Sequence, residues 1–261
     1  MKNEISKLYP SDLWSNFYDL TQIPRPSKHE AKVVEFIVGF GKSLGLEVLT
    51  DGVGNVIIRK PATPGYENRA GVIFQGHVDM VPQKNSDKVH NFETDPLQLQ
   101  IVDGWVKATG TTLGADNGIG VAAAMAVLQS KTLEHGPVEA LFTIDEESGM
   151  TGAFGLQPKL LQGSILMNLD SEDEGELYVG CAGGTNANME FLYNEVEVPK
   201  GMVGFKLSLT GLKGGHSGLD IIRGRGNANK LIFRFIKFAV SQLGVRLASI
   251  DGGNMRNAIP R

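Results

Sequence analysis

The same local pattern recurs four times in the first 170 residues: a short apolar run leads directly to an acidic or imidazole side chain. The residues reached in this way are His77, Asp116, Asp145 and Asp170. In an open α/β sheet, the carboxyl ends of the strands line one common crevice. The pattern therefore predicts a sheet that brings these side chains together at one of its edges.

The segments around these runs alternate between helix-like and strand-like patterns. Ser27 and Glu30 have the spacing of a capping box, and apolar residues follow at helical spacing as far as Leu44. An Ala-rich segment, 118–130, is predicted as another helix. The predicted strands are 46–50, 56–60, 71–75, 105–108, 138–144, 165–169 and 176–179. This alternation predicts an α/β protein with a central, mostly parallel sheet.

The pattern changes at the Gly-rich segment 180–184. Longer alternating runs follow at 185–198 and 203–212, and they are succeeded by one predicted helix, 227–243. We therefore predict two domains, with residues 1–184 forming the first. Residues 185–261 are expected to form a smaller α+β domain.

Composition and charge exclude several classes of protein. The 25 Lys and Arg residues against 29 Asp and Glu give a net charge of -4, with no basic surplus for a nucleic-acid backbone. Cys181 is the one cysteine, and the first ten residues lack the apolar run of a signal peptide. The longest apolar stretch, 119–128, is about half of the ~20 residues that cross a membrane. A soluble, cytoplasmic protein without nucleic-acid or membrane partners is expected.

Carboxylates gathered at one sheet edge repel one another unless protons or a cation intervene. An imidazole combined with carboxylates suits Zn²⁺, with Mn²⁺ and Co²⁺ as substitutes, better than Ca²⁺ or Mg²⁺. Each residue alone has a simpler explanation, since an Asp after a strand is commonly a helix cap and a Glu-Glu pair a solvated turn. The recurrence favours a metal site, but spacing does not separate a hydrolase from a structural metal site.

Longer motifs surround these residues: GHVDMVP at 76–82, GADNG at 114–118, DEESG at 145–149, NLDSE at 168–172 and GGHSG at 214–218. Together they resemble the co-catalytic zinc peptidases of the M20 family, and the resemblance continues to RNAIP at 256–260. It implies a zinc-peptidase catalytic domain joined to a lid and dimerisation domain. It also implies two zinc ions per active site, a homodimer, and hydrolysis of Xaa-His dipeptides such as carnosine.

Residue by residue, the resemblance implies a complete division of roles around the two metals. His77 and Asp170 match ligands of one zinc, Glu147 matches a ligand of the other, and Asp116 matches the carboxylate that bridges both. Glu146 matches the general base that takes a proton from the attacking water.

The resemblance implies further roles outside the ligand set. Asp79 matches the acid that orients the metal-binding imidazole, and the Asp116–Asn117 peptide bond is expected to be cis. His216 matches a donor to the substrate's carbonyl oxygen. Asn257 resembles a second substrate-contacting group.

Members of the family are longer than this chain, so the resemblance implies an incomplete second domain and a returning segment that supplies one more metal-binding His. His90 and His135 are the first residues to test as its replacement. The chain is then expected to be a fragment of a dipeptidase or a truncated gene product, with little activity of its own. Two other functions remain open: an M20-type N-acyl amino acid deacylase, and a non-catalytic metal-binding or dimerisation module.

Overall fold

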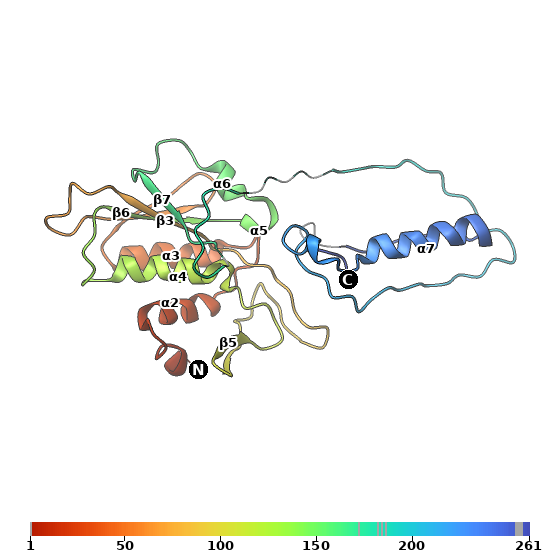
Figure 1. Cartoon of the computed structure of the whole chain (residues 1–261), viewed down its shortest axis with the longest axis horizontal. Helices are drawn as coiled ribbons and strands as arrows, with labels where there is room; N and C mark the ends of the chain where they lie inside the picture. The colour runs from red at the N-terminus through yellow and green to blue at the C-terminus, as the bar shows by residue number, and fades with distance from the viewer. Residues whose placement is uncertain (1, 172, 182, 184, 186, 254–257) are drawn as a thin grey trace. The chain divides into compact units, whose positions relative to one another are not determined.

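The computed structural model describes residues 2–171, 173–181, 183, 185, 187–253 and 258–261 (Figure 1). The chain divides into two compact units, Met1–Gly183 and Gly184–Arg261. No helix formed by the described residues combines the length and the apolar character that crossing a bilayer requires. The catalytic and lid roles expected for the two parts of the chain stay predictions.

A five-stranded sheet with the order β1-β2-β6-β3-β7 forms the centre of the first unit. Its strands are β1 (Glu47–Thr50), β2 (Val56–Lys60), β3 (Val72–His77), β6 (Val138–Thr143) and β7 (Ile165–Asn168). β3 pairs parallel with β6 and β7, whereas β2 pairs antiparallel with β1 and β6. The α/β class is confirmed, and the sheet is mixed because β2 runs against the other strands.

Helices α3 (Ala31–Ser43) and α4 (Ala115–Gln129) lie along one face of this sheet, and α2 (Ser11–Thr21) packs against α4 (Figure 1). Successive side chains of a strand point to opposite faces of the sheet, so the apolar core is divided into two clusters, one on each face. Ile58 joins the larger cluster beneath these helices, whereas its neighbour Ile57 lies in a smaller cluster on the other side. All six residues of β6 are buried, as expected for a strand covered on both faces.

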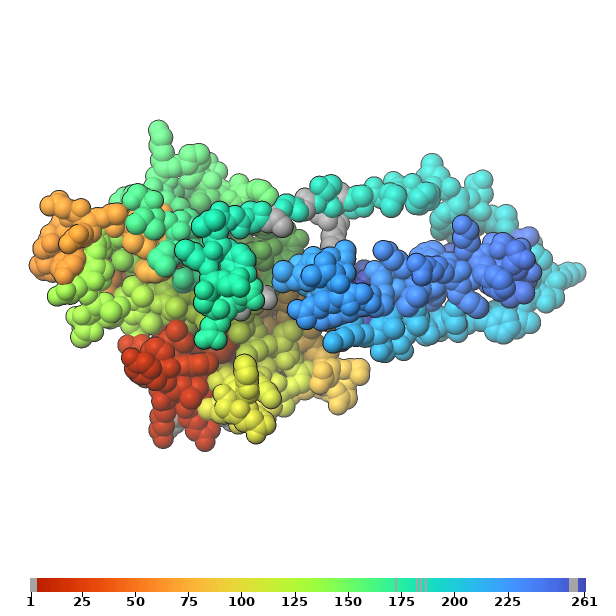
Figure 2. All heavy atoms as spheres, in the orientation of Figure 1, coloured from red at the N-terminus to blue at the C-terminus, as the bar shows by residue number. Residues whose placement is uncertain are grey.

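A separate hairpin is formed by β4 (Leu99–Val102) and β5 (Trp105–Ala108), as predicted. Asp103 and Gly104 at its turn both have positive φ, 53° and 79°, as a two-residue hairpin turn of type I′ requires. The hairpin lies beside the N-terminal helices α1 (Lys2–Ile5) and α2 (Figure 2). Leu99 anchors it there by joining the larger core cluster.

The predicted capping box at the start of α3 is wrong. α3 begins at Ala31, and its N-cap, Glu30, makes no side-chain cap bond. Ser27 lies before the cap position, and its hydroxyl instead donates to Oδ2 of Asp79 at 2.8 Å, where a carboxylate acceptor makes the hydrogen bond strong. The predicted strand 176–179 is also not formed, since none of these described residues pairs with another strand.

The second unit contains the 3-10 helix η1 (Ile221–Arg223) and helix α7 (Ala228–Leu243), whose cap Asn227 accepts a hydrogen bond from the Lys230 amide. Among its described residues, the alternating runs 187–198 and 203–212 form no β-ladder. Most of their large apolar side chains are exposed, so no partner strand or core holds them in a sheet. The α+β class of this unit stays a prediction.

Candidate metal centre

Three parallel strands deliver the candidate ligands to one edge of the sheet. His77 is the last residue of β3, Asp170 lies just beyond β7, and the Glu146–Glu147 pair follows β6 in the short helix α5 (Glu146–Gly149). Asp116 comes from the start of α4, where its backbone is non-helical and the Asp116–Asn117 peptide bond is cis. The topology therefore brings together His77, Asp116 and Asp170, as the recurrent sequence pattern predicts. For Asp145 the prediction is wrong, because its side chain joins a separate buried group with Glu30 and Asp79.

The first donor group consists of His77, Asp116 and Asp170, whose ligand atoms lie within 4.8 Å of one another. His77 Nε2 is 3.0 Å from Asp116 Oδ1 and 3.7 Å from Asp170 Oδ2. The imidazole is 1% exposed, whereas the Asp116 side chain is 54% exposed. The group is thus buried on the side of His77 and open to solvent at Asp116, which forms its rim.

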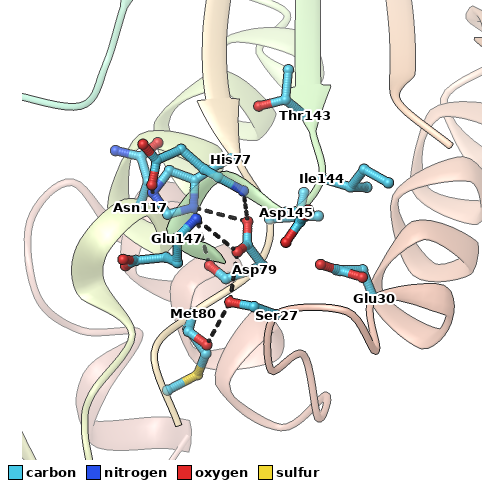
Figure 3. Close-up of polar contacts among 12 residues, drawn as sticks. Ser27, Glu30, His77, Asp79, Met80, Asn117, Thr143, Ile144, Asp145 and Glu147 are labelled. Atoms are coloured by element: carbon cyan, nitrogen blue, oxygen red, sulfur yellow. Dashed lines mark hydrogen bonds and ion pairs between the residues drawn. The ribbon is translucent and has the colours of Figure 1, made fainter. Parts of the chain in front are cut away.

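The second donor group combines His77 with Glu146 and Glu147, again within 4.8 Å. Two neighbours on a regular strand would face opposite ways, but here a turn aims both glutamates inward. The backbone N–H of Glu146 donates to Asp79 Oδ1 at 3.0 Å, and that of Glu147 donates to Asp79 Oδ2 at 3.2 Å. Figure 3 shows Glu147 beside Asp79. Asp145, which opens the turn, has a left-handed φ of 52°.

Asp79 is fully buried and connects the imidazole to this turn. His77 Nδ1 lies 3.1 Å from its carbonyl oxygen and 3.3 Å from its Oδ1, so Nδ1 donates to Asp79 and Nε2 faces the donor group. Burial alone would raise the pKa of Asp79, but hydrogen bonds from His77, the Glu146 amide and Ser27 hold it below its usual value. Asp79 therefore stays ionised behind the ring.

Charge is poorly balanced in this cluster without a cation. Burial would lower the pKa of His77, but its hydrogen bonds to Asp116 and Asp79 raise that pKa to about 10. Burial and the neighbouring charge of Asp116 raise the pKa of Glu147 to about 7 and that of Asp170 to about 6. The hydrogen bond from His77 instead lowers the pKa of Asp116, so ionised and ionisation-resistant carboxyl groups lie side by side. One imidazole among such carboxylates is a donor set that fits a divalent cation, and the imidazole favours zinc over calcium or magnesium.

A third group of carboxylates, Glu30, Asp79 and Asp145, is completely buried and needs no metal to explain it. Lys28 Nζ lies 2.5 Å from Asp145 Oδ2, and the hydroxyls of Ser148 and Thr151 donate to the same carboxylate. These donors hold the pKa of Asp145 below its usual value against the effect of burial. The group acts as a hydrogen-bonded support beneath the Glu146–Glu147 turn.

Arg25 contributes to the site without being predicted from the sequence. Its guanidinium is 2% exposed and donates to the carbonyl oxygens of Val78 (2.8 Å), Asp79 (3.1 Å) and Gly114 (2.5 Å). It thereby ties the chain after β3 to the chain before Asp116. The contacts of Ser27 and Lys28 with this site are not predictable from the sequence either. An Arg, Ser or Lys in a loop carries no local pattern that reveals a buried acceptor far away in the sequence.

The second unit holds His216. Its Nδ1 accepts hydrogen bonds from the amides of Gly218 (3.1 Å) and Leu219 (3.0 Å), so the neutral ring carries its proton on Nε2. Asn257 lies outside the described residues. His90 and His135 join no group of potential metal ligands among the residues that the structure describes.

We expect the metal-free chain to lose thermal stability as the pH rises from 5 to 8. A carboxyl group whose pKa is raised by folding stabilises the protein below its ordinary pKa and loses that contribution as the pH passes the raised value. The pKa of Glu147 is about 7 and that of Asp170 is about 6, so both side chains lose protons, and their stabilising contribution, between pH 5 and 8. Unfolding followed by circular dichroism in a chelator should show the midpoint falling by roughly 5 °C.

Added zinc should remove this fall because it neutralises the ionised carboxylates, and Glu147→Gln should reduce it because an amide does not titrate. A midpoint that is constant between pH 5 and 8 in the metal-free wild type would contradict the charge imbalance.

Comparison with known proteins identifies a family and several relatives of this chain. The family model described as peptidase family M20/M25/M40 matches residues 73–208. The chain is 54% identical to the cytosol non-specific dipeptidase of Escherichia coli K12 over 259 residues, which are 99% of this chain and 53% of that protein. The chain thus spans about half the length of this curated relative.

Solved structures of other peptidases also match this chain. The aminoacylhistidine dipeptidase of Vibrio alginolyticus matches with 52% identity and a TM-score of 0.69, over 98% of this chain and 52% of that one. A tripeptidase from Staphylococcus aureus matches with 17% identity and a TM-score of 0.53, over 95% of this chain and 63% of that one. The second likeness, at this low identity, concerns the fold alone.

Proposed function

This chain belongs to peptidase family M20/M25/M40, and from that membership we propose that it provides the metal centre of a zinc-dependent dipeptidase that hydrolyses Xaa-His dipeptides. The observation that carries the proposal is the convergence of His77, Asp116 and Asp170 within 4.8 Å, inside the matched segment 73–208. The names of the two similar dipeptidases support the reaction class. The activity proposed is that of the intact enzyme.

In this proposal the metal centre holds two zinc ions, with manganese or cobalt as substitutes. His77 and Asp170 would bind one, Glu147 would bind the other, and Asp116 would bridge both. When bound, zinc supplies a Lewis acid that polarises the scissile carbonyl group and lowers the pKa of water. The rim formed by Asp116 leaves this centre open to a small substrate.

Glu146 is proposed as the general base. Its Oε2 lies 4.0 Å from His77 Nε2, so the carboxylate borders the metal-binding atoms. It accepts the proton of the attacking water and passes it to the amine that leaves. Asp79 supports this step twice, because it fixes the His77 tautomer and holds the amides of Glu146 and Glu147 in the turn.

His216 is proposed to donate from Nε2 to the substrate's carbonyl oxygen, where negative charge develops. The two amides that donate to its Nδ1 fix the tautomer that this role requires. Asn257 is proposed as a further substrate contact. The intact enzyme is expected to be a homodimer, which sedimentation analysis would test. It is also expected to be cytoplasmic, and the name of the Escherichia coli relative supports that compartment.

A substrate panel tests the proposed specificity. Carnosine and other Xaa-His dipeptides should be cleaved, and blocking the amino terminus should abolish cleavage, because a dipeptidase reads the free amine whereas a deacylase does not. The panel should include dipeptides without His and N-acetyl amino acids, with product amines quantified by chromatography.

Equal rates on dipeptides with and without His would reduce the proposal to a non-specific dipeptidase. Cleavage of N-acyl amino acids alone would indicate the deacylase. Zinc binding without turnover on any member would indicate a non-catalytic metal-binding or dimerisation module.

A further inference from the structure

Asn117 lies beside the proposed ligands without being one of them. Its side chain is 4% exposed, and its Nδ2 donates to Asp170 Oδ1 at 2.9 Å and to the Leu169 carbonyl oxygen at 2.8 Å. Both hydrogens of the amide group are therefore used. The two bonds join the start of α4 to the chain just beyond β7, across 53 residues of sequence.

These bonds give the two oxygens of Asp170 different surroundings. Oδ1 accepts the Asn117 amide, whereas Oδ2 lies 3.7 Å from His77 Nε2. A carboxylate with both oxygens free could rotate or bind a cation through both. Here one oxygen is already engaged, and the other faces the donor group.

The orientation of the Asn117 amide is itself fixed. A flipped amide would place its oxygen against the acceptors Asp170 Oδ1 and Leu169 O. In the orientation present, Asn117 Oδ1 is buried and has no hydrogen-bond partner. A buried acceptor without a donor lowers stability, so the arrangement is explained by what the NH₂ group does.

Two glycines make room for this amide. An added Cβ at Gly76 would lie 2.4 Å from Asn117 Oδ1, and one at Gly120 would lie 2.5 Å from the same atom. Asn117 cannot move aside without breaking its bonds to Leu169 and Asp170. The backbone of β3 and of α4 is thus shaped around Asn117.

We propose that Asn117 is a positioning residue that occupies Oδ1 of Asp170 and leaves Oδ2 as the one oxygen that can bind a metal beside His77. The proposal rests on the metal centre of the proposed function. It adds a residue that touches neither metal nor substrate and that sets how Asp170 binds, through one oxygen and in one orientation.

The first test needs no metal. Crystal structures of the metal-free full chain should show the distance from His77 Nε2 to Asp170 Oδ2 increasing by more than about 1 Å in Asn117→Ala and in Asn117→Asp, because the first removes the donor and the second replaces it with a repelling carboxylate. Gly76→Ala should have the same effect by displacing an intact Asn117. Asp170 unmoved in these variants would overturn the proposal.

Zinc affinity, measured by chelator competition, gives the second readout. Asn117→Ala and Asn117→Asp should weaken binding by about 10–100-fold and change the visible absorption of the cobalt-loaded chain. Two matched control variants should leave the zinc affinity and the cobalt absorption unchanged. Asn16→Ala removes another buried Asn that donates to α4, at Ala122 O, and Gly39→Ala adds a methyl group where no atom lies within 4 Å.

These outcomes separate the two proposals. A wild-type chain that binds no zinc would contradict the proposed metal centre, while the metal-free structures would still decide the role of Asn117. If Asn117→Ala does not fold, Asn117→Asp, which keeps the side-chain size, decides it. Wild-type zinc affinity and cobalt absorption in a folded Asn117→Asp chain would overturn the positioning role.

Discussion

Replacing Glu146 with Gln in the active enzyme is expected to reduce kcat for dipeptide hydrolysis by about 10²–10⁴-fold. The amide keeps the size and shape of the side chain but cannot accept the proton of the attacking water. Zinc content should stay nearly unchanged, because the proposed ligands are His77, Asp116, Glu147 and Asp170. Steady-state kinetics and atomic absorption on the same preparation provide both measurements.

Glu147→Gln is the matched control, since it changes the neighbouring residue of the same turn in the same way. It should deplete one zinc, because an amide is a weaker ligand than a carboxylate. Equal zinc loss in the two variants would mean that the pair is assigned wrongly. Full activity of Glu146→Gln would remove Glu146 from the mechanism.

Arg25→Met is expected to lower the free energy of unfolding by about 3–5 kcal/mol, because it removes three charge-assisted hydrogen bonds to buried carbonyl oxygens. The carbonyl oxygens of Asp79 and Gly114 keep a second contact, to His77 Nδ1 and the Gly118 amide, whereas Val78 loses its side-chain donor. Burial lowers the pKa of Arg25 to about 10, which still keeps it protonated at neutral pH. Urea unfolding of the metal-free chain would measure the loss directly.

Arg69→Met is the control for removing a guanidinium, since Arg69 is exposed and stacks over Tyr66 at 5.9 Å. It should change stability by less than about 0.5 kcal/mol. The loss of stability in Arg25→Lys should lie between those of the two Met variants, because a lysine ammonium group cannot reach all the acceptors that the planar guanidinium group reaches. Equal stability of Arg25→Met and wild type would show that water satisfies these carbonyls.

The sequence was sufficient to predict the parts of the site that depend on strand ends. His77 and Asp170 follow apolar runs that became β3 and β7, and parallel pairing then placed them at one edge. The hairpin at Asp103–Gly104 was also predictable, because its turn chemistry is local. Local patterns carry this information since strand polarity and turn conformation are set by neighbouring residues.

Contacts between distant loops could not be predicted in this way. Ser27 has the spacing of a helix cap, and nothing near it in sequence reveals that Asp79 lies 2.8 Å away. The hydrogen bond from Lys28 to Asp145 likewise joins residues 117 positions apart in the sequence. In the second unit the alternating pattern predicts strands, but a strand also needs a partner, which a pattern within one segment does not specify.

The central position of β3 has a consequence for the order in which the chain is synthesised. Both neighbours of β3, β6 and β7, come later in the sequence, so β3 has no strand to pair with while the ribosome is producing residues 78–137. The β1–β2 hairpin also waits for β6, which is the strand that joins it to β3. A chain made only as far as residue 137 contains His77 and Asp116 but lacks the strand pairing that holds them at one edge, so the candidate donor groups assemble only after β6 has been synthesised.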